Sequence, residues 1–187
     1  IVNAIENFEG LKPTEQAYQA FQLMLNENGL GLDELPKGSI PFHKYNTSTA
    51  SAFEEHFYEA AAYASKEGKA YLHFTISEEH QTKFENEFNE IKNRISKETK
   101  IDFEVSFSFQ KKATDTLAVD LENKPFRLTN GKLLFRPGGH GALIENLNDV
   151  DADLIFIKNI DNISHRNNLE VNAFYKKALA GYLLKVQ

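Results

Sequence analysis

The sequence predicts an α/β fold in which a mostly parallel sheet is flanked by helices. Apolar and polar residues alternate along residues 101–109, which is the period of a strand with one wet face. Residues 84–95, just before this strand, carry apolar side chains at helical spacing. A helix between two strands favours parallel pairing. The chain has 187 residues, and we expect residues 1–187 to form a single α/β domain with one core.

The first helix is predicted for residues 13–28, where Pro13 lies in the first turn and Gly29 ends the pattern. We expect this helix to cover a face of the sheet. Residues 35–45 follow and contain two prolines, which exclude a helix and prevent full pairing in a sheet. An extended loop with one short strand is predicted there.

The second helix is predicted to begin near Ser51, since Ser51 and Glu54 fit a capping box, and to end at Gly68. Its aromatic stripe is typical of a core face. A buried strand is predicted for residues 70–77, and Ser77 is placed to cap the third helix.

Later elements follow from turn signals and apolar runs. Residues 126–135 predict a β-hairpin insertion that turns at Asn130 and Gly131. Residues 154–160 form an apolar run that is typical of a strand covered on both faces. A closing helix is predicted for residues 168–185.

A glycine-rich loop connects the hairpin to the apolar run. Gly138, Gly139 and Gly141 surround His140, and glycines allow positive φ and close approach of a ligand to backbone N–H groups. Asp161 follows the predicted strand, and ligands of α/β sheets bind outside the carboxyl ends of strands. Loop and aspartate are therefore expected to line one crevice. The alternative is a tight surface turn and ordinary turn chemistry at Asp161.

Composition excludes several classes of function. The net charge is −6 without a basic cluster, so we expect no nucleic-acid partner. The absence of cysteine excludes disulfides, thiolate zinc sites and cysteine nucleophiles. That absence also fits a cytoplasmic protein, and because no apolar run reaches the length of a membrane helix we expect no membrane partner. No serine lies in a G-x-S-x-G elbow, which disfavours a serine hydrolase.

Two polar groupings raise the question of a metal site. His73 and His80 would lie in a strand and in the next helix, unlike the paired histidines of zinc hydrolases, so His73 is expected to be a satisfied buried side chain. Four further residues crowd the second helix and are interpreted as its polar face: Glu54, Glu55, His56 and Glu59.

Four motifs occur in a characteristic order. They are Pro36-Lys37-Gly38, Gln110 at a strand end, the run from Asn130 through the Gly138–Gly141 loop, and Asn159-Ile-Asp161-Asn162. This series resembles the UDP-sugar pyrophosphorylase family of nucleotidyltransferases. The sequence of residues 35–45 and 136–143 looks closer still to an uncharacterised bacterial family, which is itself similar to these pyrophosphorylases.

The resemblance implies a Rossmann-like sheet and a reaction between a sugar 1-phosphate and a nucleoside triphosphate such as UTP, which releases pyrophosphate with Mg²⁺. By position, Lys37 would contact phosphate and Asp161 would serve the metal. Gln110 and the loop of Gly138, Gly139, His140 and Gly141 would hold the base.

The sequence departs from that family in ways that define an alternative. His140 replaces a loop asparagine, and the family's first strand, its glycine-rich phosphate loop and its sugar-binding part have no counterpart. We therefore expect a fragment of a longer protein that folds but does not catalyse the transfer. The alternatives are a non-catalytic domain that binds a nucleotide or sugar phosphate, and an interaction domain without a ligand.

Overall fold

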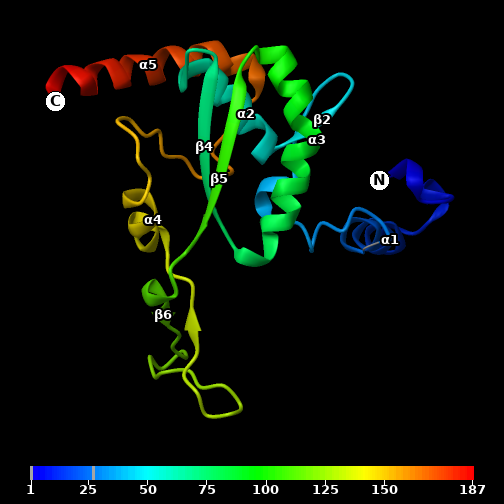
Figure 1. Ribbon diagram of the computed structural model, residues 1–187. Coiled ribbons are helices and arrows are strands. Elements are labelled where there is room, and N and C mark those ends of the chain that lie inside the picture. The colour runs from blue at the N-terminus through cyan, green and yellow to red at the C-terminus, as the bar shows by residue number, and fades with distance from the viewer. Residues whose placement is uncertain (1, 27) are drawn as a thin grey trace. The chain divides into compact units, whose positions relative to one another are not determined.

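The computed structural model describes residues 2–26 and 28–187 as an α/β chain with several helices and small sheets (Figure 1). Two compact units can be distinguished. Unit 1 comprises Ile1–His56 and Asn159–His165, and unit 2 comprises Phe57–Lys158 and Arg166–Gln187. Within the described ranges, no helix has the length and apolar character needed to cross a membrane.

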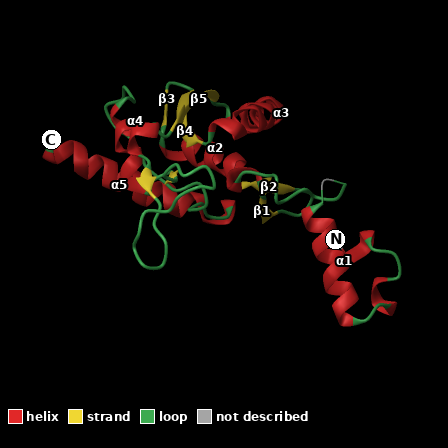
Figure 2. Cartoon of the chain, turned by 90° about the horizontal axis from the view of Figure 1, so that it is seen from below, coloured by secondary structure: helices red, strands yellow, loops and turns green. Residues whose placement is uncertain are grey.

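In unit 1, helix α1 spans Pro13–Leu25 and starts at a proline, as predicted (Figure 2). It ends three residues earlier than expected. Gly29 is required nearby, because a Cβ on it would lie 2.0 Å from the carbonyl oxygen of Leu23. None of its residues is buried and Phe21 is 61% exposed, so its apolar face is not covered within unit 1, and the expectation that it covers the larger sheet stays a prediction.

The predicted short strand is β1, Pro41–Lys44, which pairs antiparallel with β2, Thr49–Ser51. Helix α2 spans Ala52–Tyr63, and the Ser51 hydroxyl accepts a hydrogen bond from the Glu54 N–H at 3.0 Å, which supplies half of the predicted capping box. The helix stops before Gly68, because the short strand Ser65–Lys66 follows it and Gly68 lies in the turn to the next strand, Lys69–Ile76.

The three-stranded sheet of unit 2 has the order β3-β4-β5, and its strands are labelled in Figure 2. Strand β3, Ser65–Lys66, is antiparallel to β4, Lys69–Ile76, whereas β4 is parallel to β5, Asp102–Phe109, along its whole length. Helix α3, Gln81–Thr99, connects the two parallel strands. This βαβ unit confirms the local pattern prediction, while the larger Rossmann-like sheet stays a proposal.

Aromatic side chains form the core of this βαβ unit. Phe57 is fully buried, stacks on Phe88 of α3 at 5.4 Å between ring centroids, and meets Phe103 of β5 edge-on at 5.3 Å. Such pairs add to the apolar burial that holds helix to sheet. Phe84 and Ile95 of α3 are also buried, as the helical spacing predicts.

Ser77 does not cap α3 with its side chain. A 3-10 turn, Glu78–His80, separates Ser77 from the helix, and Ser77 makes no side-chain cap hydrogen bond. At its other end, α3 stops at Thr99, and its C-cap residue Lys100 has a left-handed φ of 62°.

The predicted hairpin is confirmed as a set of short antiparallel pieces. Strands β6, Thr116–Leu117, and β7, Phe135–Arg136, pair antiparallel, and Arg127 bridges Leu133. The turn is a three-residue loop: the Leu128 N–H donates to the Lys132 carbonyl at 2.8 Å, and Gly131 takes the φ of +79° that favours glycine.

The remaining helices are α4, Ile144–Asn148, and α5, Leu169–Val186, and the latter matches the predicted closing helix. The strand predicted for residues 154–160 is wrong: the segment is irregular and pairs with no strand of the described chain. It packs on α2 instead, where Phe156 meets Tyr63 edge-on at 4.9 Å. Further 3-10 turns are Val2–Ala4, Phe8–Gly10, Lys37–Ser39, Lys112–Thr114, His140–Leu143 and Arg166–Asn168.

Candidate functional site

Lys37 and Asp161, which lie far apart in the sequence, meet in unit 1. The Lys37 ammonium is 2.5 Å from Asp161 Oδ2. Lys37 projects outward because its neighbours Pro36 and Gly38 are buried and anchor the turn that it begins. The two side chains are 67% and 38% exposed, so the pair remains open to an anionic ligand.

Asp161 lies in a turn rather than at a strand end. The Asn162 N–H donates to the Asn159 carbonyl at 3.0 Å, which closes the turn around Ile160 and Asp161. His56 of α2 donates from Nε2 to the Ile160 carbonyl at 2.9 Å. The turn is therefore held by its own backbone and by α2.

A metal at this place would depend on its substrate. The described residues contain no cluster of three or more His, Asp or Glu side chains that could hold an ion. Mg²⁺ is commonly bound by one or two carboxylates together with substrate phosphates. Asp161 fits such an ion as a single protein ligand, provided that phosphate oxygens supply others.

The polar residues of α2 do not form a solvated face, and that interpretation is wrong. Glu54, Glu55 and Glu59 are all buried. Buried carboxylates need partners, and here distant segments supply them. In unit 1, Glu55 accepts a hydrogen bond from the Tyr45 hydroxyl at 2.7 Å and lies 3.4 Å from Nδ1 of His43.

Glu59 has its partners in unit 2. Lys158 contacts Glu59 Oε2 at 2.5 Å, and the Tyr63 hydroxyl donates to the same oxygen at 2.7 Å. Burial, followed by this hydrogen bond to Glu59, raises the pKa of Tyr63 well above its usual range. The raised pKa keeps the hydroxyl protonated, and so a donor to Glu59, to a higher pH than in a solvent-exposed tyrosine.

The predicted base-binding residues Gln110 and Gly138 are neighbours in unit 2. Gln110 follows β5, and its side-chain amide donates to Asp115 at 3.4 Å. A Cβ on Gly138 would lie 3.6 Å from that amide nitrogen and 3.0 Å from the Thr114 carbonyl oxygen. Gly138 therefore allows these protein atoms to pack closely, whereas the predicted approach of a ligand stays a prediction.

The rest of the loop differs from the expectation. Gly138, Gly139 and Gly141 do not have positive φ, and a Cβ on Gly139 or Gly141 would meet nothing within 4 Å. His140 is exposed and begins a 3-10 turn. Gly139 and Gly141 thus leave open space beside the backbone, where a ligand could approach.

Asn146 is a site residue that the sequence gave no signal for. It is buried, and its amide nitrogen donates to the Ser108 hydroxyl at 2.9 Å and to the Phe109 carbonyl at 2.8 Å. These bonds attach α4 to the carboxyl end of β5, next to Gln110. Its Oδ1 is buried without a hydrogen-bond partner.

His73 is satisfied, as predicted, but exposed rather than buried. Its two ring nitrogens lie 2.8 Å from the hydroxyls of Ser106 and Ser108, so one nitrogen donates and the other accepts. Partial desolvation lowers the pKa of His73. His80 belongs to the turn before α3 and shares no metal site with His73 in the described chain.

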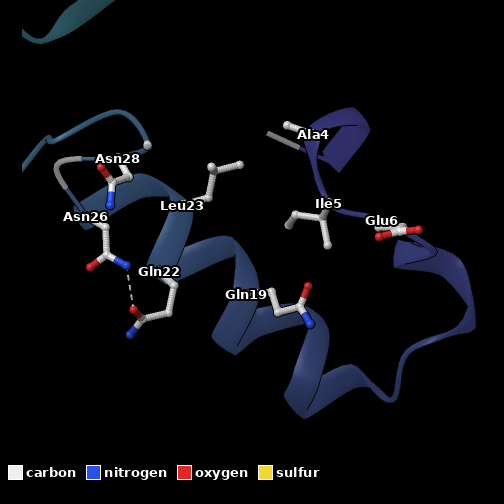
Figure 3. A pocket seen from close by; sticks show the side chains of 9 residues that line it. Ala4, Ile5, Glu6, Gln19, Gln22, Leu23, Asn26 and Asn28 are labelled. Carbon is white, nitrogen blue, oxygen red and sulfur yellow. Dashed lines mark hydrogen bonds between the residues drawn. The ribbon is translucent and has the colours of Figure 1, made fainter.

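A hollow of about 320 Å³ lies elsewhere in unit 1, between α1 and the preceding turns (Figure 3). Amide side chains and the apolar Ile5 and Leu23 line it, and its charged residue is the acidic Glu6. It contains none of the predicted site residues, and a phosphate would be repelled by Glu6. We do not regard it as the phosphate site.

Lys37 and Asp161 belong to unit 1, whereas Gln110 and the Gly138–Gly141 loop belong to unit 2. The structure brings together the members of each pair. Their convergence on one crevice stays a prediction.

Comparison with known proteins identifies the family. The model described as "Domain of unknown function (DUF4301)" matches residues 1–187, so the chain belongs to that family. No curated protein and no solved structure matches the chain.

Proposed function

We propose that this DUF4301 chain belongs to a nucleotidyltransferase that joins a sugar 1-phosphate to a nucleoside triphosphate such as UTP and releases pyrophosphate. The observation that carries the proposal is the Lys37–Asp161 pair. Both residues stand in motifs that resemble the phosphate and metal positions of UDP-sugar pyrophosphorylases, and they are in contact.

The chemistry fits these residues. Phosphoryl and nucleotidyl transfer depend on positioning and on neutralising developing charge more than on a covalent intermediate. Lys37 would bind a phosphate oxygen through its ammonium, and Asp161 would hold Mg²⁺, which supplies Lewis-acid neutralisation of the phosphates. In the ligand-free chain Lys37 and Asp161 neutralise each other. A phosphate oxygen of an incoming triphosphate would replace Asp161 as the partner of the Lys37 ammonium.

The base end of the ligand is assigned to unit 2. Gln110 offers an amide that can both donate and accept, and the open backbone at Gly139 and Gly141 offers N–H groups. In this proposal the β4–α3–β5 unit is part of a Rossmann-like, mostly parallel sheet, with Gln110 at the carboxyl end of β5.

The test is pyrophosphate release from UTP and Mg²⁺ with a panel of sugar 1-phosphates, measured on the complete protein. Lys37→Ala and Asp161→Ala should each lower the rate on the order of a hundredfold, since each removes a group that faces developing phosphate charge. Lys69→Ala changes another exposed lysine that pairs with a carboxylate, and serves as the control. Rates of both site variants within a few fold of wild type would refute the assignment.

The second candidate is a domain that binds a nucleotide or sugar phosphate without catalysis. The exposed His140, in place of the loop asparagine, favours it. Calorimetric binding of UTP by a complete protein that releases no pyrophosphate would establish this alternative.

A further inference from the structure

We propose that Glu55 and His56, consecutive residues of α2, are positioning residues for the Lys37–Asp161 pair. Each anchors one of the two segments that carry the pair. The inference rests on the proposed function for the ligand, but its structural part can be tested without one.

Glu55 anchors the segment that follows Lys37. Its carboxylate is almost fully buried, accepts the Tyr45 hydroxyl hydrogen bond, and faces the buried Nδ1 of His43. A buried carboxylate is costly unless it is paired, so these contacts favour one position of β1 and of the residues next to it. Lys37 lies in the 3-10 turn that precedes β1, so the contacts that hold β1 also restrict the position of Lys37.

His56 anchors the segment that carries Asp161. Because a carbonyl oxygen can only accept, His56 must carry its proton on Nε2 to bond to Ile160. That bond fixes the peptide immediately before Asp161 and so limits where the carboxylate can lie.

A third contact ties the two segments to each other. The His165 ring lies 4.4 Å from the Tyr45 ring and 5.5 Å from the His43 ring, between centroids. The segments are therefore in contact at the Lys37–Asp161 pair and again at these rings. Adjacent positions on one helix thus fix the two segments relative to each other, which gives the buried carboxylate of Glu55 a role.

The test uses a carbodiimide, which activates a carboxylate for attack by the amine of a lysine in contact with it; an amide forms and the carbodiimide leaves as its urea. Mass spectrometry of the 187-residue chain should find a Lys37–Asp161 cross-link. Lys111 and Asp149, 2.8 Å apart in unit 2, provide an internal standard on the same molecules.

The variants separate positioning from general stability. His56→Asn has an amide too short to reach Ile160, whereas the longer His56→Gln can donate to it. We expect His56→Asn to lower the cross-link, relative to Lys111–Asp149, by about fivefold, the effect of losing one hydrogen bond. His56→Gln should restore it. Tyr45→Phe removes the hydroxyl that donates to Glu55 and should also lower the yield of the Lys37–Asp161 cross-link relative to Lys111–Asp149.

Unchanged ratios in His56→Asn and Tyr45→Phe would overturn the proposal, as would equal loss in His56→Asn and His56→Gln. The affinity of the same variants for tripolyphosphate tests the proposed phosphate site separately from the positioning role. A lowered cross-link with unchanged tripolyphosphate affinity would support the positioning role and refute the phosphate site.

Discussion

Lys158→Met tests the buried ion pair that attaches the segment before Asp161 to α2. The Lys158 and Glu59 side chains are only 12% and 4% exposed, and their charged atoms are 2.5 Å apart. Methionine keeps most of the aliphatic stem but removes the charge, so Glu59 would retain Tyr63 as a partner and lose its counter-ion. Removing one partner of a buried pair typically costs about 3 to 5 kcal/mol, and we expect a loss of this size.

The assay is urea denaturation followed by circular dichroism at pH 7. Lys69→Met is the matched control, because Lys69 also pairs with a glutamate but both side chains are about half exposed. Exposed pairs contribute little, so this variant should leave the denaturation midpoint unchanged within error. The double variant Glu59→Gln and Lys158→Met should recover most of the loss, since it removes the uncompensated charge while keeping an acceptor for Tyr63.

A Lys158→Met protein within about 1 kcal/mol of wild type would refute this reasoning, because such a cost is typical of an exposed pair. Failure of the double variant to recover stability would show that packing of the Lys158 stem, rather than charge, holds the segment.

Two further predictions concern unit 2. The free energy of unfolding should fall as the pH decreases below about 6.5, because His73 binds a proton there in the unfolded chain, whereas desolvation lowers its pKa in the folded chain. His73→Gln should therefore reduce the dependence of the urea midpoint on pH between pH 7 and 5. An identical pH dependence in the variant would contradict this prediction. Gly138→Ala should cost about 1 to 3 kcal/mol, since the new Cβ would lie 2.9 Å from Ala142 Cβ and 3.0 Å from the Thr114 oxygen. Gly139→Ala, which meets nothing, should change stability by less than about 0.5 kcal/mol, and equal effects of the two changes in thermal melts would contradict the prediction.

Local patterns predicted the βαβ unit well, because alternation along residues 101–109 and helical spacing before it are properties of the segment itself. Residues 154–160 show where such patterns stop being informative. Their composition is that of a strand, but a strand also needs a neighbour with free backbone groups, and the described chain supplies none to this segment. Phe156 packs on Tyr63 of α2 instead, while Ile155 and Ile157 stay exposed.

Short motifs predicted which residues of the candidate site lie next to each other, while the roles of these residues stay proposals. Lys37 and Asp161 were expected together and are in contact, and Gln110 and Gly138 are neighbours. The buried carboxylates of α2 were not predictable, because Glu55 and Glu59 gain their partners from distant segments. Asn146 was missed for the same reason, since only the folded chain places its amide against the end of β5.

The most direct test of the phosphate and base assignments is a pair of calorimetric titrations of the complete protein with Mg²⁺, one with UTP and one with tripolyphosphate. Lys37→Ala should weaken both ligands, because both contain the phosphate chain. Gln110→Ala should weaken UTP by about tenfold and leave tripolyphosphate unchanged, since only UTP has a base and a lost hydrogen bond to it costs on the order of 1 kcal/mol. Equal weakening of both ligands by Gln110→Ala, or no effect of Lys37→Ala on either, would contradict the division of roles proposed here.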